Sequence, residues 1–260
     1  MNVRWLRCWK WAADYFPIRV VKTCDIPADG QNYLAVCHPH GAMALSTQLV
    51  FGTEGADISH VFPGLRSWGF GFWFFFITPF QREFFIAIGG RPATDQAINQ
   101  LFSTSTNNLA GLVVGGIRDF VEQRPDEFRL VVRRRRGFCR IALKTGTHLV
   151  PVIAFGEDRL FKKVAALSST IAQLMDRFGH RFIGTALFYG RGLTPSMPGP
   201  LPHRVPITMV FGKPVKVSKK SSPTQEDIQD LNDRYCLALT NLYNEHKSKY
   251  RYENRPLVLI

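Results

Sequence analysis

The tetrapeptide His38-Pro39-His40-Gly41 places two imidazoles on either side of a proline, directly after an apolar run at residues 33–37. Proline fixes its own φ and biases His38 toward an extended conformation, and Gly41 allows a tight turn. The two rings are therefore held on a constrained loop where a buried strand ends. Because the ordinary pKa of histidine lies near neutrality, this loop could supply a general base or a metal ligand. The alternative is that the rings only bond to neighbouring backbone groups.

Two carboxylates occupy comparable positions after later strands. Asp119 follows the turn at Gly115 and Gly116, and Glu157 follows another strand exit. Because parallel strands end along one edge of a sheet, His40, Asp119 and Glu157 could converge there. An aspartate that accepts a ring N–H raises the basicity of the imidazole, which predicts a dyad of His40 with Asp119. The alternative for Asp119 is the ordinary role of aspartate in a turn.

The densest positive charge is a run of four arginines followed by a glycine and a further arginine: Arg133, Arg134, Arg135, Arg136, Gly137 and Arg140. Arginine forks match phosphate oxygens, and a glycine beside them lets phosphate approach a helix N-terminus. The run therefore predicts a site for a nucleotide phosphate or a phospholipid headgroup, against the alternative of a solvated basic turn. Nucleic acid is a third reading, but no recognition motif accompanies the charge.

Composition limits the class of protein. The 260 residues carry a formal net charge of +13 and are 45% hydrophobic, which indicates a folded chain with an anionic partner. Five dispersed cysteines, with no C-x-x-C pair and no ligand spacing to the histidines, argue for reduced thiols and against a zinc site. We find no G-x-S-x-G, P-loop or G-x-G-x-x-G motif, which disfavours serine hydrolysis and nucleotide hydrolysis.

Two segments have membrane-like patterns. Residues 1–16 form an amphipathic helix on a helical wheel, with Trp5, Trp9 and Phe16 on one face and cations opposite. Such a helix suits a membrane interface, or equally a surface packed on the core. Residues 68–80 are aromatic and uncharged but shorter than the ~20 residues of a spanning helix. We expect a partly embedded helix, the wall of an apolar tunnel or a core helix there, and neither a transmembrane span nor a secretory signal.

The rest of the chain alternates between helical and strand patterns. We predict a single α/β domain over residues 1–260, with a largely parallel or mixed sheet flanked by helices. Ser222 is the expected N-cap of the last helix, with Gln225 closing a capping box. The predicted helices cover residues 94–102, 138–144 and the region after 223, the predicted strands cover 109–114, 128–132, 149–155, 207–211 and 215–217, and residues 190–206 form a long loop.

Taken together, the motifs resemble the type-2 diacylglycerol acyltransferase family, which includes monoacylglycerol and wax-alcohol acyltransferases. They follow one another in order from about residue 14 to residue 249. The matching elements are Tyr15-Phe16-Pro17, His38-Pro39-His40-Gly41, Val114-Gly115-Gly116, residues 136–143 and 149–157, Gly190-Arg191-Gly192, Pro206-Ile207-Thr208 and residues 223–228.

The resemblance implies a fold like that of glycerolipid acyltransferases and transfer of a fatty acyl group from acyl-CoA. The acceptor would be the hydroxyl of a diacylglycerol, monoacylglycerol or fatty alcohol, and the product triacylglycerol or a related neutral lipid. Acyl-CoA is then a co-substrate, and we expect no other cofactor, no metal and no nucleic acid. The implied setting is the cytosolic face of the endoplasmic reticulum membrane or a lipid droplet, and a homo-oligomer is compatible with it.

The resemblance also implies roles for the residues above. His40 is the expected base and acts without a covalent intermediate, while backbone N–H groups or an arginine stabilise the oxyanion. His38 and Asp119 complete the catalytic set, and the arginine run with Gly137 and Arg140 binds the phosphates of coenzyme A. The supporting residues of the loop are Pro39, Gly41, Gly115, Gly116 and Glu157.

The chain departs from the family pattern at two places. Family members usually carry Gly-Gly-x-x-Glu, whereas Asp119 stands at the last position here and is one methylene shorter. A short amphipathic segment also stands where relatives have a hydrophobic hairpin. Both departures define the alternative function, a catalytically impaired homologue that binds acyl-CoA or lipid.

Overall fold

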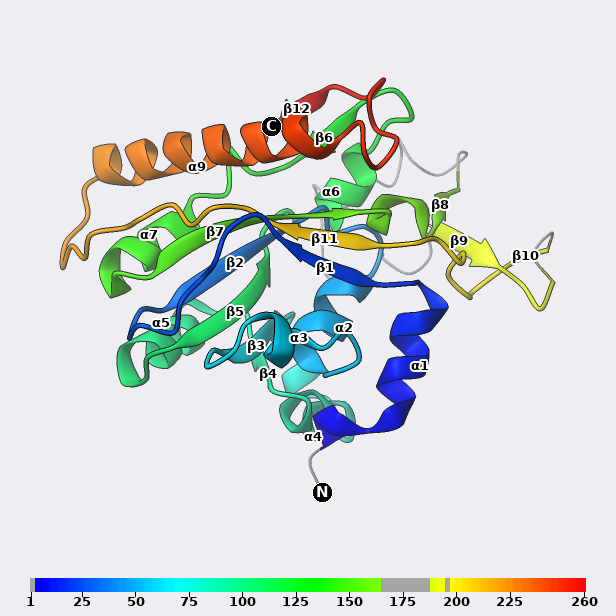
Figure 1. Cartoon of the computed structure of the whole chain (residues 1–260), viewed down its shortest axis with the longest axis horizontal. Coiled ribbons are helices and arrows are strands. Elements are labelled where there is room, and N and C mark those ends of the chain that lie inside the picture. Colours follow the sequence, from blue (N-terminus) through cyan, green and yellow to red (C-terminus); the bar gives the residue numbers. More distant parts are fainter. Residues whose placement is uncertain (1–2, 165–187, 195–196) are drawn as a thin grey trace.

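A seven-stranded sheet is the centre of the computed structural model, which describes residues 3–164, 188–194 and 197–260 (Figure 1). Neighbouring strands are parallel except at one pair, β11 and β7, so the sheet is mixed, as expected from the sequence. In spatial order the strands are β1 (Arg19–Lys22), β11 (Thr208–Phe211), β7 (His148–Phe155), β2 (Tyr33–His38), β5 (Asn108–Val113), β3 (Arg66–Gly71) and β4 (Gly90–Pro92).

The middle of the sheet is formed by three parallel apolar strands, β5, β2 and β7. All six residues of β2 are buried, as expected of a strand covered on both faces. The register pairs Cys37 with Val113 on one side and with Val152 on the other. The carboxyl ends of these strands therefore meet at one edge, and the segments that follow them are neighbours in space.

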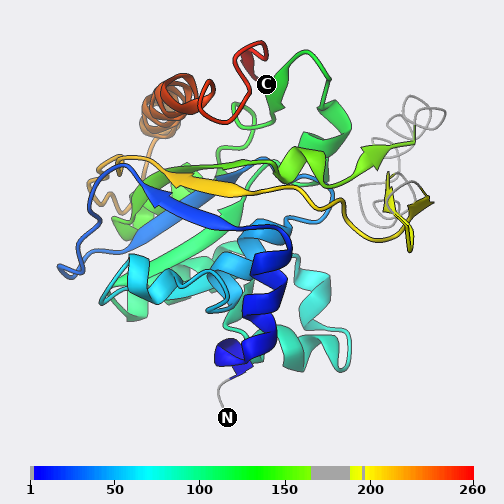
Figure 2. The same cartoon turned by 45° about the vertical axis from the view of Figure 1, so that its right-hand side comes forward.

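Helices cover both faces of the sheet, and the side chains of β2 alternate between the two cores. Leu34 and Val36 join the core beneath α5 (Asp95–Thr104), α7 (Gly137–Thr145) and α9 (Gln225–His246). Tyr33 and Ala35 join the core on the opposite face, with α1 (Arg7–Tyr15), α2 (Leu45–Gly52) and α3 (Ile58–Val61). Figure 2 shows α9 on one side of the sheet and α1 on the other.

The last helix begins two residues later than the sequence pattern indicated. Thr224, not Ser222, is the N-cap of α9, and its side chain accepts a hydrogen bond from the N–H of Asp227. Asp227 in turn accepts from the N–H of Thr224 at 2.9 Å. The capping box is thus closed by an aspartate, whereas Gln225 is already the first residue of the helix.

The aromatic segment at residues 68–80 is not one helix. Its first part belongs to β3, which pairs with β5 and β4, because Gly69 and Gly71 disfavour a helix and fit the sheet. A 3-10 turn, η2 (Trp73–Phe76), follows, and the helix α4 (Gln81–Ala87) comes after it. None of the described helices combines the length and apolarity needed to cross a membrane.

The remaining elements lie outside the main sheet. The predicted strand at 128–132 pairs with the C-terminal strand, and the predicted strand at 215–217 forms only one bridge, from Val215 to Leu149. The expected loop at 190–206 contains short strands, and its residues 195–196 lie outside the described ones, as do residues 1–2 of the expected N-terminal helix. The elements outside the main sheet that have not been named above are η1 (Val3–Trp5), α6 (Ile117–Glu122), β6 (Phe128–Leu130), η3 (Glu157–Arg159), β8 (Lys162–Lys163), β9 (Phe188–Arg191), β10 (Pro198–Gly199) and β12 (Leu257–Leu259).

Candidate active site

The histidine loop lies at the carboxyl edge of the sheet, directly after the central strand β2. His38 is the last residue of that strand and is fully buried, whereas His40 is half-buried. The peptide bond between His38 and Pro39 is cis. Gly41 has φ +58° and begins a turn in which the N–H of Ala44 donates to the carbonyl of His40 at 2.9 Å. The loop is therefore short and tied to its own backbone.

The imidazole of His40 is oriented by the carbonyl oxygen of Gly41, which lies 3.0 Å from Nδ1. Because a carbonyl can only accept, Nδ1 carries the ring proton and Nε2 keeps its lone pair. Nε2 has no hydrogen-bond partner in the part of the chain that the structure describes. Burial lowers the pKa of His40 below its ordinary value, opposed by the bond to Gly41, so the ring is neutral at pH 7. A neutral imidazole with a free Nε2 can accept a proton.

Asp119 reaches the histidine loop through the backbone. Its Oδ2 accepts from the N–H of His40 at 3.1 Å, and its Oδ1 accepts from the N–H of Val131 at 2.8 Å. This contact differs from the ring-to-carboxylate dyad expected from the sequence, because both oxygens are bonded to peptide groups and Nδ1 is bonded to Gly41. Asp119 thus fixes where the backbone of His40 lies.

The carboxyl group of Asp119 is completely buried beside a glycine. A Cβ at Gly115 would lie 2.0 Å from both carboxylate oxygens, so only glycine leaves room for them. Desolvation raises the pKa of Asp119 to about 7, although the bonds from Val131 and His40 and the charge of Arg135 oppose the shift. The sequence-predicted pair of Gly115 and Asp119 therefore forms one packed unit at the edge of the sheet.

Glu157 supports the other side of the loop. Its carboxylate accepts from the N–H groups of Leu45 and Ser46 at 2.9 and 3.0 Å, which are the first residues of α2. Ala44, at the N-cap of that helix, offers no side-chain bond, so Glu157 supplies the missing cap. A Cβ at Gly41 would lie 3.0 Å from Cγ of Glu157. The glutamate is buried, and desolvation raises its pKa to about 7.

His38 points into the core beneath α9. Its Nε2 lies 3.0 Å from the hydroxyl of Tyr235, which also bonds to the carbonyl of Val36. Nδ1 of His38 is buried and has no partner among the described residues. Desolvation lowers the pKa of His38 to about 3, so the ring stays neutral. Tyr235 is a buried residue of α9, and helical spacing carries no signal for its bond to His38.

The arginine run connects β6 to α7 next to the site. Its four arginines are exposed, and the positive charge of Arg135 acts to lower the pKa of Asp119. Arg133 lies 3.9 Å from Asp233 of α9, and Gly137 is the first residue of α7. Arg140 instead forms an ion pair with Asp95, which joins α7 to α5. Within the described ranges, no group of three His, Cys, Asp or Glu side chains could hold a metal ion.

One protein-family model covers the histidine loop, the turn at Gly115 and Gly116, and the arginine run. The family model described as diacylglycerol acyltransferase matches residues 1–260. The chain belongs to the diacylglycerol acyltransferase family. Members of this family are acyltransferases, and the match covers residues 1–260 of this acyltransferase.

Curated proteins support the assignment. This acyltransferase is 34% identical to acyl-CoA wax alcohol acyltransferase 2 of Mus musculus, over 99% of this chain and 78% of that protein. It is 33% identical to 2-acylglycerol O-acyltransferase 1 of Bos taurus, over 98% and 78%, and 34% identical to diacylglycerol O-acyltransferase 2 of Homo sapiens, over 95% and 65%. Among solved structures, it aligns with the 1-acyl-sn-glycerophosphate acyltransferase PlsC of Thermotoga maritima at a TM-score of 0.48 and 13% identity, over 91% of this chain and 76% of that one.

Proposed function

We propose that this acyltransferase moves a fatty acyl group from acyl-CoA to the hydroxyl of an acylglycerol or fatty alcohol, with His40 as general base. Nε2 of His40 takes the proton of the acceptor hydroxyl as the oxygen attacks the thioester carbonyl. The tetrahedral intermediate then collapses, the carbon–sulfur bond breaks, and the imidazolium returns its proton to the thiolate of coenzyme A. The products are an ester and free coenzyme A, and no covalent bond to the protein forms.

The hydrogen bond from Nδ1 of His40 to the carbonyl of Gly41 is the observation that carries this mechanism. It fixes the tautomer, so the lone pair on Nε2 is available without help from a carboxylate. Asp119 and Glu157 hold the backbone of the loop instead, through His40 N–H and through the start of α2. The bond between His38 and Tyr235 fixes the end of β2 against α9.

The arginine run is the proposed site for the phosphates of acyl-CoA. Arg134, Arg135 and Arg136 are exposed at the turn that enters α7, and Arg135 is close enough to lower the pKa of Asp119. Guanidinium groups at this place could hold the charged end of the co-substrate beside the histidine loop. We propose no resident cofactor and no metal, since the chemistry above requires neither.

The reaction is tested by giving the purified chain labelled oleoyl-CoA and a panel of diacylglycerol, monoacylglycerol and long-chain alcohol in phospholipid vesicles. We expect labelled ester with at least one acceptor and an equal amount of free coenzyme A. The acceptor panel also decides the preferred hydroxyl. Binding of oleoyl-CoA by folded protein without ester formed on any acceptor would contradict acyl transfer and favour the impaired homologue.

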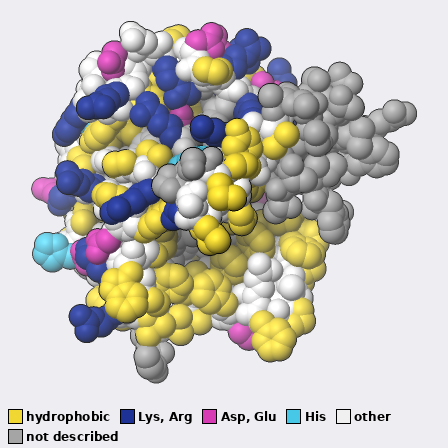
Figure 3. Space-filling view, turned by 90° about the vertical axis from the view of Figure 1, so that its right-hand side faces the viewer, with side chains coloured by type: hydrophobic (Ala, Val, Ile, Leu, Met, Phe, Trp, Pro, Cys, Tyr) yellow, Lys and Arg dark blue, Asp and Glu magenta, His cyan; other side chains and the backbone are white. Residues whose placement is uncertain are grey.

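An exposed, mostly aromatic surface supports a membrane setting. We define it by nine exposed side chains, which are 36% to 89% accessible: Trp5, Trp11, Phe72, Trp73, Phe74, Ile77, Phe80, Phe84 and Ile86. The rings of Trp9 and Phe84, 6.0 Å apart, join α1 to α4 at this surface. Figure 3 shows hydrophobic side chains gathered over the lower part of the molecule, where Figure 1 places these helices. We propose that this surface enters the cytosolic leaflet of the endoplasmic reticulum or the surface of a lipid droplet.

The aromatic surface makes vesicle binding sensitive to single apolar side chains. Phe80 is 89% exposed, and burying a phenylalanine in lipid contributes roughly 2 kcal/mol, so Phe80→Ser is expected to weaken binding to vesicles by about 30-fold. Flotation with phosphatidylcholine vesicles measures it. Leu237→Ser is the matched control, because Leu237 is 63% exposed on α9, away from this surface. Equal losses for both variants would exclude a specific membrane face.

A further inference from the structure

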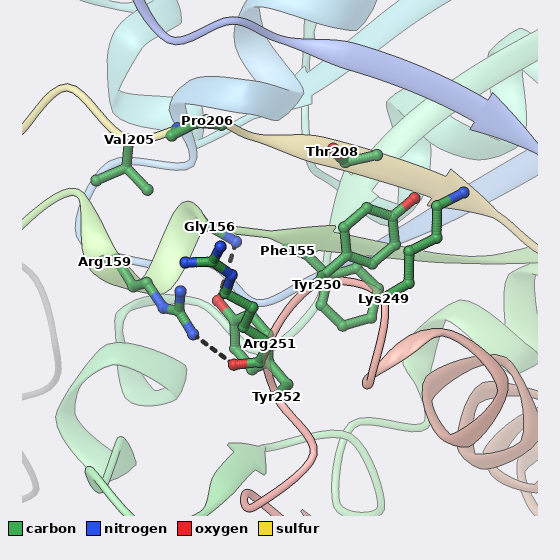
Figure 4. Close-up of a pocket in the computed structure, with 10 residues that line it drawn as sticks. All are labelled: Phe155, Gly156, Arg159, Val205, Pro206, Thr208, Lys249, Tyr250, Arg251 and Tyr252. Carbon is green, nitrogen blue, oxygen red and sulfur yellow. Dashed lines mark hydrogen bonds between the residues drawn. The ribbon is translucent and has the colours of Figure 1, made fainter.

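A pocket of about 380 Å³ lies on the α9 side of the sheet (Figure 4). It opens between β11, the end of β7 and residues 249–252, which follow α9. Its buried base is formed by Phe155, Gly156 and Tyr252, and Thr208 of β11 forms a wall. The mechanism above uses none of these residues.

The pocket is strongly cationic. Arg159, Lys249 and Arg251 line it and are exposed, and its described lining includes no acidic residue. The neighbouring carboxylate of Asp158 is already neutralised, because Nη1 of Arg255 lies 2.6 Å from it. In the ranges that the structure describes, the three lining cations form no ion pair with a carboxylate. Three positive charges therefore surround one cavity without a protein anion.

The guanidinium of Arg159 is tied to the base of the pocket. The guanidinium of Arg159 lies 4.2 Å from the ring centre of Tyr252, and its Nη2 donates to the carbonyl of Arg251 at 3.0 Å. The hydroxyl of Tyr252 accepts from the N–H of Gly156 at 3.0 Å. Arg251 has φ +62°, in the left-handed region that costs free energy for a residue with a side chain. Such strain is typical of sites that present a side chain to a ligand.

We propose that this pocket binds the phosphate monoester of a water-soluble ligand. A dianion would bring the counter-charge that the protein does not supply, and arginine and lysine together form strong charge-assisted bonds to phosphate oxygens. A lipid phosphate fits less well, because the aromatic surface lies with α1 and α4 on the opposite side of the sheet from residues 249–252 (Figure 1). The proposal is independent of acyl transfer.

The test is a calorimetric titration of the full chain with adenosine monophosphate, with adenosine as the uncharged probe. We expect saturable binding of the monophosphate and at least about tenfold weaker binding of adenosine. Lys249→Ala should weaken monophosphate binding about fivefold, and Arg159→Gln should do likewise. Lys144→Ala is the matched control, since Lys144 is exposed on α7 and should leave the affinity unchanged. The exposure of Lys249 lets its variant keep the melting temperature of the parent.

Three results would overturn the proposal. Equal binding of adenosine and the monophosphate would show that phosphate is not recognised. Loss of binding in Arg134→Ala but not in Lys249→Ala would place the anion on the arginine run instead. A lipid phosphate is tested separately with phosphatidic acid vesicles. Vesicle binding that depends on Lys249, with no binding of soluble monophosphate, would assign the pocket to a lipid headgroup.

Discussion

Replacing His40 by alanine is expected to lower kcat for acyl transfer by about 10³-fold while leaving the fold intact. The ring is half-buried and, among the described residues, bonds only to the neighbouring carbonyl of Gly41, so its loss removes the base without opening the core. Single-turnover assays with labelled oleoyl-CoA measure the chemical step. His60→Ala is the matched control, because His60 is exposed on α3 and its loss should leave kcat unchanged.

The pH profile separates a base from a structural histidine. Burial lowers the pKa of His40, so the neutral, active form persists to lower pH than for an ordinary histidine. We therefore expect kcat to fall on acidification with a midpoint below the ordinary pKa of histidine. His38→Ala should behave differently, since His38 is buried against Tyr235 and its loss should lower the melting temperature. A His40→Ala variant with more than half of the parental kcat would exclude His40 as the base.

The meeting of the histidine loop with Asp119 and Glu157 followed from sequence because it depends on topology. The apolar runs before them predict parallel strands, and adjacent parallel strands end at one edge. The sequence did not predict which atoms form hydrogen bonds at that edge. Asp119 accepts from the backbone N–H of His40 and not from its ring, because Nδ1 is already bonded to the carbonyl of Gly41. That choice depends on backbone dihedrals, which residue types restrict but do not determine.

Long-range packing was the other part that sequence patterns left undetermined. Tyr235 is a core residue that lies 197 positions from His38, and no local pattern predicts their contact. The cationic pocket likewise brings residues 249–252 against the end of β7, with Tyr252 bonding to Gly156, 96 positions away. The composition of the aromatic segment at residues 68–80 is compatible with an embedded helix, a tunnel wall or a core helix, and pairing with β5 makes its first part a strand.

Gly115→Ala is expected to lower the free energy of unfolding by about 3 kcal/mol or more. It should also lower kcat for acyl transfer, because the histidine loop is displaced. The new Cβ would lie 2.0 Å from both oxygens of Asp119, which are buried and bonded to backbone N–H groups. Either the carboxylate moves and leaves His40 N–H without an acceptor, or the turn opens. Urea unfolding gives the free energy of unfolding, and Gly137→Ala is the matched control because nothing lies within 4 Å of its Cβ position.

A double-mutant cycle tests whether the effect acts through Asp119. Asp119→Ala removes the atoms that the new methyl group would strike, so adding Gly115→Ala to that variant should cost far less than it costs the parent. The expected coupling energy is about 2 kcal/mol, measured from the four unfolding curves. Additive losses would mean that Gly115 is required for the turn itself. Coupled losses, together with a fall in kcat for each single variant, would show that the glycine is there to let a buried carboxylate position the backbone of the catalytic base.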